Sequence, residues 1–449
     1  MNLQELKSTL FARGAAMGFT DMEVSYQSNN QFSGKVFKGE IDTYSIAVDG
    51  GLSFRGRYND KMGYAYTELI DEAAIDSLLN GAKASAETID SADTEPLYAG
   101  PFEYETVELF SEKLAQATPA QMIDLLKEIE AECFRLDKRI ALVTYCNAQA
   151  VTSERMIANT RGLDRSEKVN LSFLLFSAVA REGSDTKSSF KILPVHDLAA
   201  IDPKAVAKEV VDEAISYLGA EPLESRPYPI LLRNTAAASM LTAFDVVFFA
   251  ENVQKGRSGL KGRIGEMIGS ERVTLVDDPF LPGAVGSRSF DSEGVPSRRL
   301  NLMENGVLTS FLYNLKSAGV EGVASTGHGY KPSYKGAIAT APSNLYLKPG
   351  ERSLEEMVAD TDEAVIITSL QGLHSGANPI SGDFSLAAHG YYVKGGKIVK
   401  PVNQITVAGN FYTVLQEIEE VGSDLEFVPF GANVGSPTLR IRSLAVAGK

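Results

Sequence analysis

The sequence predicts an α+β protein in which N-terminal mixed α/β domains precede a mainly β, glycine-rich C-terminal domain. Helical and strand patterns alternate through the first half of the chain, whereas short strands and glycine-rich turns dominate most of the second half. The chain has 449 residues and 44% hydrophobic content, which is enough for two or three packed domains. We therefore expect domains at residues 1–90, 102–220 and 228–449.

The N-terminal domain is predicted to begin with a helix and to continue as strands. Apolar residues recur at helical spacing across residues 3–17. Separate short strands follow between residues 21 and 39, and the dipeptide Asp49-Gly50 predicts a hairpin turn between two further strands. A second amphipathic helix is expected at residues 71–88.

The middle domain follows a linker at residues 91–101 that is rich in proline, glycine and acidic residues. Its predicted elements are a helix at 119–135, strands at 140–145, 154–159 and 170–180, and a closing amphipathic helix at 202–218. Prolines and polar residues at 219–228 then predict the main domain boundary.

The C-terminal domain is predicted to open with a strand at residues 229–232 and a helix at 234–250. The rest has a β pattern with many glycines. Asn305-Gly306 predicts one hairpin turn, and the glycine pair at 395–396 predicts another. Runs of strands after mixed helices and strands are typical of an α+β protein.

Composition and charge exclude several classes of function. A net charge of −15 disfavours direct contact with nucleic acid, because a negative chain repels phosphate backbones. The sequence has no apolar run long enough to span a bilayer and no signal-peptide pattern at its start. Two cysteines, Cys133 and Cys146, cannot build a disulfide framework. We therefore expect a cytoplasmic protein without membrane contact.

Common catalytic motifs are absent from the sequence. It contains no HExxH zinc motif, no GxSxG nucleophile motif and no phosphate-binding loop. His374, His389 and Asp383 share one glycine-rich region and could form a metal site or an acid–base pair. The alternative, favoured because the spacing matches no known ligand pattern, is that they are polar residues lining a cleft.

Two acidic pairs and one histidine are interpreted as structural. Asp277-Asp278 precedes Pro279, and neighbouring residues on a strand point to opposite faces, so the pair is expected to open a turn. Asp291 and Glu293, before another glycine and proline, receive the same interpretation. His328 lies between two glycines and is expected in a flexible loop.

The segment at residues 372–385 combines glycines with polar side chains. The glycines allow another chain to approach the backbone closely, and the polar side chains can form hydrogen bonds at loop positions. Such a loop beside exposed strands could accept an extended peptide by strand addition. The alternative is an ordinary tight connection between strands. The candidate peptide-binding residues are His374, Gly376, Asn378, Gly382, Asp383 and Phe384.

Several segments carry a resemblance to a known family. They are, in chain order, Gly51-Leu52-Ser53-Phe54-Arg55, Asp277-Asp278-Pro279, Gly294-Val295-Pro296-Ser297, Glu304-Asn305-Gly306, the stretch from Leu373 to Asn410, and Gly435-Ser436-Pro437-Thr438-Leu439-Arg440. Together they resemble the TldD/PmbA family, whose members are also called modulators of DNA gyrase. The resemblance spans nearly the whole chain.

The resemblance implies one of two kinds of subunit. The TldD kind has HExxxH after a short strand and a cysteine near the C-terminus, whereas the PmbA kind, also called TldE, lacks this zinc site. Here Arg233 and Ala238 occupy the histidine positions, Asn234 occupies the glutamate position, and no cysteine follows Cys146. Arginine and alanine cannot bind zinc, so we expect neither a metal nor a catalytic residue in this chain.

The leading hypothesis is therefore a PmbA/TldE-type subunit of a cytoplasmic zinc-peptidase complex. The resemblance implies a TldD-like partner that supplies the zinc and a substrate that is an unfolded or extended peptide, such as a peptide precursor or an antitoxin. A homodimer of this chain is an assembly that the sequence leaves open. One alternative is a non-enzymatic regulator that binds a protein such as DNA gyrase. Another is an autonomous hydrolase that uses His374, His389 and Asp383.

Overall fold

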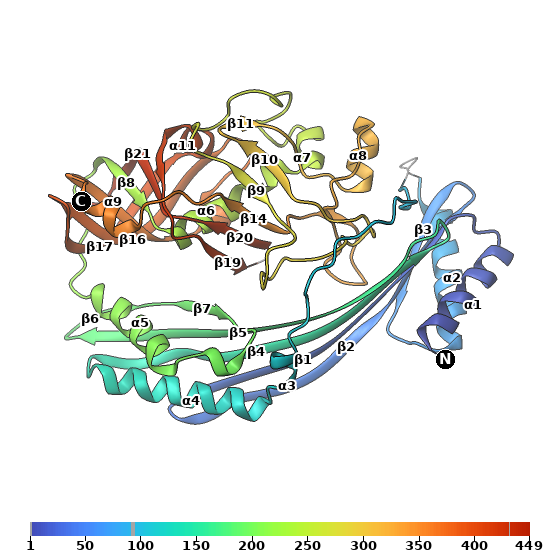
Figure 1. Ribbon diagram of the computed structural model, residues 1–449, viewed down its shortest axis with the longest axis horizontal. Helices are drawn as coiled ribbons and strands as arrows, with labels where there is room; N and C mark the ends of the chain where they lie inside the picture. Colours follow the sequence, from blue (N-terminus) through green and yellow to red (C-terminus); the bar gives the residue numbers. More distant parts are fainter. Residues whose placement is uncertain (1, 91–94, 431) are drawn as a thin grey trace.

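The computed structural model describes residues 2–90, 95–430 and 432–449. Figure 1 shows a long, curved sheet along one side of the molecule and the C-terminal half packed over its inner face. Helices and strands are mixed in the N-terminal part, and strands dominate the C-terminal half, so the predicted α+β class is confirmed. The predicted linker at 91–101 lies partly outside the described residues, because positions 91–94 are not described.

The long sheet is antiparallel and extends through both the N-terminal and the middle part of the chain. Its strand order is β3-β2-β1-β4-β5-β6, and β7 also pairs with β5. The strands are β1 (Met22–Phe37), β2 (Glu40–Tyr58), β3 (Lys61–Thr67), β4 (Ile140–Asn159), β5 (Asp164–Glu182), β6 (Asp185–Ser188) and β7 (Lys191–Pro194).

Two predictions for this sheet are wrong. β1 and β4 are each continuous, where separate shorter strands were expected, because each pairs with a neighbour on both sides along most of its length. The hairpin turn between β1 and β2 lies at Lys38 and Gly39, both with positive φ, and not at Asp49-Gly50. Asp49 instead accepts a cross-strand hydrogen bond from Asn29 Nδ2 at 2.8 Å.

Helices cover the outer face of the long sheet in two groups, one at each end (Figure 1). The first group is α1 (Leu3–Ala16) and α2 (Glu72–Thr88), which pack on β1 and β2. The second group is α3 (Glu112–Gln116), α4 (Pro119–Leu136) and α5 (Pro203–Ser216), with a 3-10 turn, η1 (Leu198–Ala200), nearby. The predicted helices at 71–88, 119–135 and 202–218 are thus confirmed to within two residues at each end.

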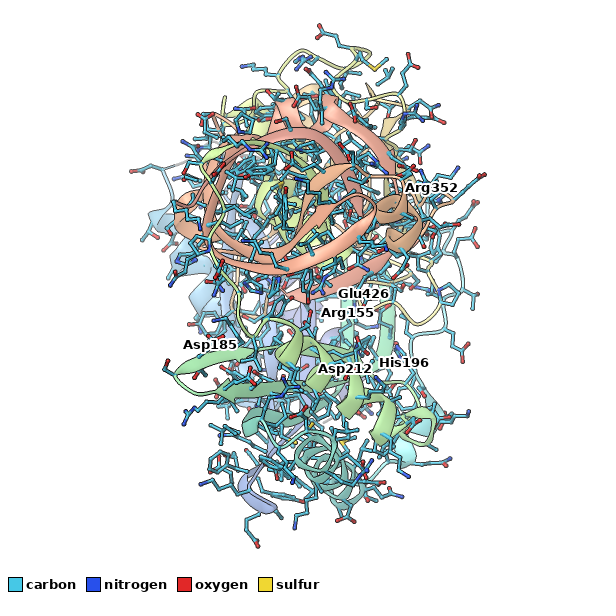
Figure 2. The ribbon with its side chains drawn as sticks, turned by 90° about the vertical axis from the view of Figure 1, so that its left-hand side faces the viewer. Arg155, Asp185, His196, Asp212, Arg352 and Glu426 are labelled. Atoms are coloured by element: carbon cyan, nitrogen blue, oxygen red, sulfur yellow. The ribbon has the colours of Figure 1, made fainter. Side chains whose placement is uncertain are left out.

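The C-terminal half contains a sheet that closes on itself. Its order is β17-β16-β15-β8-β21-β18, and an extra pairing of β17 with β21 completes a ring of strands. Figure 2 looks into this ring. The strands are β8 (Arg226–Leu232), β15 (Glu363–Gln371), β16 (Asp383–Lys394), β17 (Lys397–Asn410), β18 (Ile418–Val421) and β21 (Leu439–Ala447). The predicted hairpin at glycines 395–396 is confirmed.

A second sheet of the C-terminal half has the order β11-β10-β9-β14-β20-β19. Its strands are β9 (Leu275–Asp277), β10 (Leu300–Glu304), β11 (Val307–Leu308), β14 (Asn344–Leu347), β19 (Glu426–Phe430) and β20 (Ala432–Ser436); β12 (Gly329–Tyr330) and β13 (Ala339–Thr340) form a separate pair. The Asn305-Gly306 turn joins β10 to β11 with positive φ at both residues, as predicted.

The predicted helix at 234–250 is shorter than expected. α6 (Asn234–Phe244) is followed by a 3-10 turn, η2 (Asp245–Phe248), and by α7 (Ala250–Gln254). The other helices here are α8 (Leu315–Glu321), α9 (Leu354–Ala359), α10 (Leu373–Gly376) and α11 (Phe411–Glu417). One large apolar core joins α6 to both sheets of this half. None of the described helices is both long and apolar enough to cross a membrane.

Candidate functional site

Arg233 lies where β8 ends and α6 begins, and its side chain reaches back to the middle part of the chain. Its Nη1 donates to Glu213 Oε1 on α5 at 2.6 Å, and its Nη2 donates more weakly to the Thr368 carbonyl at 3.4 Å. Burial opposes the charge of Arg233, but the Glu213 carboxylate more than offsets this effect and raises the arginine pKa. The ion pair therefore connects the C-terminal half to α5.

Asn234 and Ala238 also have structural contacts. The Asn234 side-chain amide donates to the Asp424 carbonyl at 2.9 Å, and the Asp424 carboxylate accepts from both the backbone N–H and the hydroxyl of Thr438. Asn234 therefore anchors the loop that leads into β19. Ala238 is fully buried in α6, which packs against β19 and β20.

The side chains at these three positions do not fit a zinc ion. The Arg233 guanidinium carries a permanent positive charge and is already paired with Glu213, and the Ala238 methyl group has no donor atom. Within residues 2–90, 95–430 and 432–449, no group of three His, Cys, Asp or Glu side chains could hold a metal ion. α6, the helix on which the resemblance would place a zinc motif, is formed in this chain. The Asn234 side chain at its start makes a structural hydrogen bond to the Asp424 carbonyl.

β19 has an open edge beside this position. It pairs with β20 alone among the described strands, so its outer backbone groups have no strand partner there. Figure 1 shows β19 on the side of the C-terminal half that faces β5 and β7, and Figure 2 places Glu426 of β19 close to the sheet below. The Glu426 carboxylate is within electrostatic reach of Lys191 and Arg233.

The glycine-rich loop at residues 372–385 packs tightly against its own chain. A side chain at Gly376 would meet the Ser385 carbonyl, and one at Gly382, where φ is +83°, would meet the Tyr412 ring at 2.6 Å. Asn378 Oδ1 accepts from the Ile380 backbone N–H at 3.0 Å, which forms a local turn. These contacts explain the glycines as parts of a tight connection between strands.

The remaining predicted peptide-binding residues differ in exposure. His374 and Asn378 are exposed, and so is Asp383, whose pKa is lowered by hydrogen bonds from Asn410 and Ser381. Phe384 is 4% exposed and packs in the main core, so its side chain offers no surface to a peptide. Peptide binding by the exposed members of this set stays a prediction.

The structure does not bring His374, His389 and Asp383 together as an acid–base group. Asp383 and His389 are both on β16, six residues apart, which corresponds to about 20 Å along a strand. The His389 ring packs against the Tyr217 ring at 4.9 Å, and burial lowers its pKa. His389 thus belongs with Tyr217 and Arg233, a cluster that sequence reasoning missed because α5 was assigned to another domain.

Two structural interpretations from the sequence need correction. His328 is 1% exposed and not in a flexible loop, because its Nε2 contacts Asp277 Oδ1 at 2.9 Å and its Nδ1 contacts Thr326 Oγ1 at 2.8 Å. Asp277 ends β9 and does not open a turn, although Asp278 does, by accepting from the Phe280 N–H. Burial opposes the charge of Asp277, but His328 and Ser343 more than offset it and lower its pKa.

Asp291 and Glu293 are both buried beneath the loop that they were expected to open. Asp291 does hold the turn, because it accepts backbone N–H groups of Glu293, Val295 and Gly329. Glu293 accepts from the Leu315 N–H at 2.8 Å, and burial raises its pKa to about 8. The apolar residues of β9 before Asp277 are a local signal of burial, whereas no apolar run precedes Asp291 or Glu293 to indicate theirs.

Comparisons with known proteins agree over the whole chain. Three domain models of the PmbA/TldA metallopeptidases match: domain 1 at residues 22–86, the central domain at 112–218 and the C-terminal domain at 225–448. An uncharacterized protein of Methanocaldococcus jannaschii is 31% identical over 88% of each chain. The metalloprotease PmbA of Escherichia coli O157:H7 is 25% identical and covers 100% of this chain and 96% of its own.

Two solved structures are similar along their full length. A Thermotoga maritima protein described as a modulator of a DNA gyrase has 32% identity and a TM-score of 0.92, with 99% of this chain and 100% of that chain covered. TldE from Thermococcus kodakarensis has 24% identity and a TM-score of 0.91, with the same coverage, and it supports the fold alone.

Proposed function

This chain belongs to the PmbA/TldD metallopeptidase family, and from this premise we propose that it is the non-catalytic, PmbA/TldE-type subunit of a two-chain zinc peptidase. In this proposal a TldD-like partner holds the zinc and cleaves the substrate. This chain shapes the shared chamber and binds the peptide. The expected substrates are unfolded or extended peptides, such as a peptide precursor or an antitoxin.

The ion pair between Arg233 and Glu213 is the observation that carries this proposal. A guanidinium with a carboxylate partner stands where the family resemblance places a zinc-binding histidine, and the ion pair links the start of α6 to α5. A partly buried pair of this kind has a cost to break, because the remaining partner would keep a less well compensated charge. The position thus has a stabilising role in place of a catalytic one.

The open edge of β19 supports the peptide-binding part of the proposal. An extended peptide gains backbone hydrogen bonds by adding to an unpaired strand edge, whatever its sequence. Asn234 donates a hydrogen bond to Asp424, and β19 starts two residues after Asp424. The edge of β19 therefore lies next to the segment where the resemblance places the zinc motif. A peptide on this edge would lie between the C-terminal half and the long sheet.

The outer half of β2 supports the partner-binding part. β3 pairs with β2 only from Leu52 to Tyr58, so residues 40–51 form a sheet edge with β1 on one side alone among the described strands. Tyr44, Ile46 and Val48 alternate along this edge and share one face, and Ile46 and Val48 are 58% and 73% exposed.

Such an edge usually carries protection against other chains. Natural sheets cover a long edge or place lysine, proline or a bulge on it, because exposed apolar edges recruit further strands. Glu40, Asp42 and Asp49 place charges near the two ends of this edge, and the pairing with β1 is irregular beside Asp42, but residues 43–48 contain no charged side chain. We assign this edge to the zinc-bearing sister subunit, whose family fold provides a matching sheet; pairing with a second copy of this chain is the other outcome that a test can reveal.

Metal analysis and a cleavage assay on the purified chain test the proposed non-catalytic role. We expect no stoichiometric zinc and no cleavage of a reduced, carboxymethylated protein by this chain alone. Stoichiometric zinc or cleavage that is lost on His374→Ala or His389→Ala would instead establish the autonomous hydrolase. The variant Lys394→Ala, at an exposed position on the same strand as His389, is the matched control.

A further inference from the structure

A cavity of about 180 Å³ lies between the long sheet and the C-terminal half. Its floor is the inner face of the sheet, where Ser25 and Gln27 of β1 stand opposite Ile157 and Arg155 of β4. Its other walls come from residues 288–292 and 330–334 of the C-terminal half. The residues that line this cavity include neither Arg233 nor any residue of β19.

Two cations line this cavity without a carboxylate partner. The Arg288 Nε–H is buried and has no hydrogen-bond partner among the described residues, and Nη2 makes only long contacts of 3.4 Å to two carbonyls. The Lys331 ammonium donates to Ser53 Oγ at 2.6 Å and lies 5.0 Å from the Tyr64 ring centroid. Neither side chain forms an ion pair within the described residues.

The acidic groups nearby are already engaged. Both oxygens of Asp291 accept backbone N–H groups. Glu23 is paired with Arg55 and Glu167 with Arg155. Among the cations that line the cavity, Arg288 and Lys331 therefore have no carboxylate partner within the described residues, and burying donors without an acceptor is costly.

The remaining walls are aromatic. Phe290, Tyr330 and Tyr334 line the cavity, and the Arg155 guanidinium stacks over the Phe290 ring at 4.6 Å. The volume is close to that of a cavity that holds one benzene ring, about 150 Å³. A site of this size with cationic donors and aromatic walls suits one carboxylate attached to a small apolar group, because the neighbouring acids would repel a more highly charged ligand.

We propose that this cavity binds the carboxylate of a small aromatic or aliphatic acid, held by the Lys331 ammonium and the Arg288 guanidinium. The acid can be a free molecule or the C-terminal residue of a peptide, since both present the same chemical group. This inference is independent of the proposed peptidase role, because it involves neither Arg233 nor β19.

Isothermal titration calorimetry of the full chain tests the proposal with matched acids and amides. We expect 3-phenylpropionate to bind at least tenfold more tightly than 3-phenylpropanamide. A second arm compares N-acetyl-Ala-Ala-Phe with its C-terminal amide: binding of this peptide acid identifies a peptide C-terminus as the ligand, and binding of 3-phenylpropionate alone identifies a free acid. Equal affinities for acid and amide, or no heat from either acid at millimolar concentration, would overturn the proposal.

Variants separate the role of the Lys331 ammonium from a general electrostatic effect. Lys331→Met is expected to weaken acid binding at least tenfold, and Lys331→Arg to keep most of it. The matched control is Lys335→Met, because Lys335 is a nearby exposed lysine paired with Glu68. An equal loss with Lys335→Met would contradict the assignment.

A second pair of variants covers the case in which Lys331→Met fails to fold. Ser25 lies on the cavity floor, and its side chain makes no hydrogen bond to another residue that the structure describes. Ser25→Leu should fill the cavity and abolish acid binding, whereas Ser25→Ala should leave binding unchanged. Retained acid binding by a folded Ser25→Leu variant would show that the acid binds elsewhere and would contradict the proposal.

Discussion

The closed sheet of the C-terminal half and the long sheet differ in whether their edge strands are paired. The C-terminal sheet closes through the pairing of β17 with β21, whereas the long sheet leaves half of β2 open and apolar. Closure removes the edges that invite further strands, and an open apolar edge does the reverse. In the proposed complex, the closed ring of β8, β15, β16, β17 and β21 would act as a scaffold and the open edge of the long sheet would contact the other subunit.

The largest expected effect comes from charging the open edge. Ile46→Lys together with Val48→Lys should weaken the complex with the sister subunit at least 1,000-fold, about 4 kcal/mol, because two ammonium groups would have to be buried. The thermal midpoint of the isolated chain should change little, since both positions are exposed. Analytical ultracentrifugation of the mixture measures the loss.

The closed ring offers a matched control. Ile398 on β17 is 54% exposed, close to the value for Ile46, but its strand belongs to the closed sheet. Ile398→Lys should leave the complex intact. Loss of the complex with Ile398→Lys and its survival with the β2 variant would reverse the roles that we assign to the two sheets.

Breaking the ion pair between Arg233 and Glu213 should have the next largest effect. Arg233→Met leaves Glu213 with the Tyr217 hydroxyl as its remaining side-chain donor and should lower the free energy of unfolding by about 2 kcal/mol, because the pair is only partly buried. The double variant with Glu213→Met should recover part of the loss, because no uncompensated charge remains. Urea unfolding of the wild type, both single variants and the double variant measures the coupling, and additive losses would show that the pair has no stabilising role.

Asp245 makes the stability of the C-terminal half depend on pH. It is buried at the end of α6, and burial raises its pKa to about 7. A carboxyl with a raised pKa holds its proton in the folded state, so stability present in acid is lost as pH rises toward and through 7. The shift corresponds to about 4 kcal/mol at most, and we expect Asp245→Asn to recover roughly half at pH 8, since the new amide must also be buried.

Chemical denaturation at two pH values checks this prediction. Asp245→Asn should be more stable than the wild type at pH 8 and should show no gain at pH 4, where the wild-type carboxyl is protonated in the folded state. A gain of equal size at both pH values would trace the effect to packing and not to the charge.

The smallest expected effect concerns the glycine-rich loop. Gly382→Ala should cost about 2 kcal/mol, because φ is +83° and the new methyl group would meet the Tyr412 ring. Gly395→Ala, with φ of +57° and open space around it, should cost only about 1 kcal/mol. Thermal unfolding compares the two, and a silent Gly382→Ala variant would remove the structural explanation of this loop.

Local patterns could predict much of this fold. The helices at 71–88 and 119–135 follow from apolar residues at helical spacing, and Asn305-Gly306 adopts the left-handed conformation that its turn requires. Asp49-Gly50 does not form a turn, although the motif is equally strong, because the turn at Lys38-Gly39, directly before β2, fixes the register and leaves Gly50 inside β2. A local motif cannot report the pairing of a long strand.

The residue types at the candidate site could be interpreted from the sequence, but their contacts with distant residues could not. Arg233 and Ala238 exclude a zinc motif by residue type alone, but Glu213 precedes Arg233 by twenty positions in another predicted domain, and nothing local links them. His328 shows the same limit, because two flanking glycines indicate flexibility while its partner Asp277 is far away in sequence. The cavity that we propose to bind a carboxylate is likewise lined by residues from both halves of the chain.

We propose that this chain serves a zinc peptidase without catalysing cleavage itself. Reconstitution of the complex from its two subunits, with peptide cleavage as the readout, tests this proposal directly. The purified chain, a sister subunit that carries HExxxH and the 1:1 mixture are each incubated with an unfolded peptide, and products are followed by mass spectrometry. We predict efficient cleavage in the mixture alone, lost when a histidine of the sister's motif is changed to alanine. Cleavage by this chain alone, or a mixture no faster than the sister subunit alone, would contradict the account.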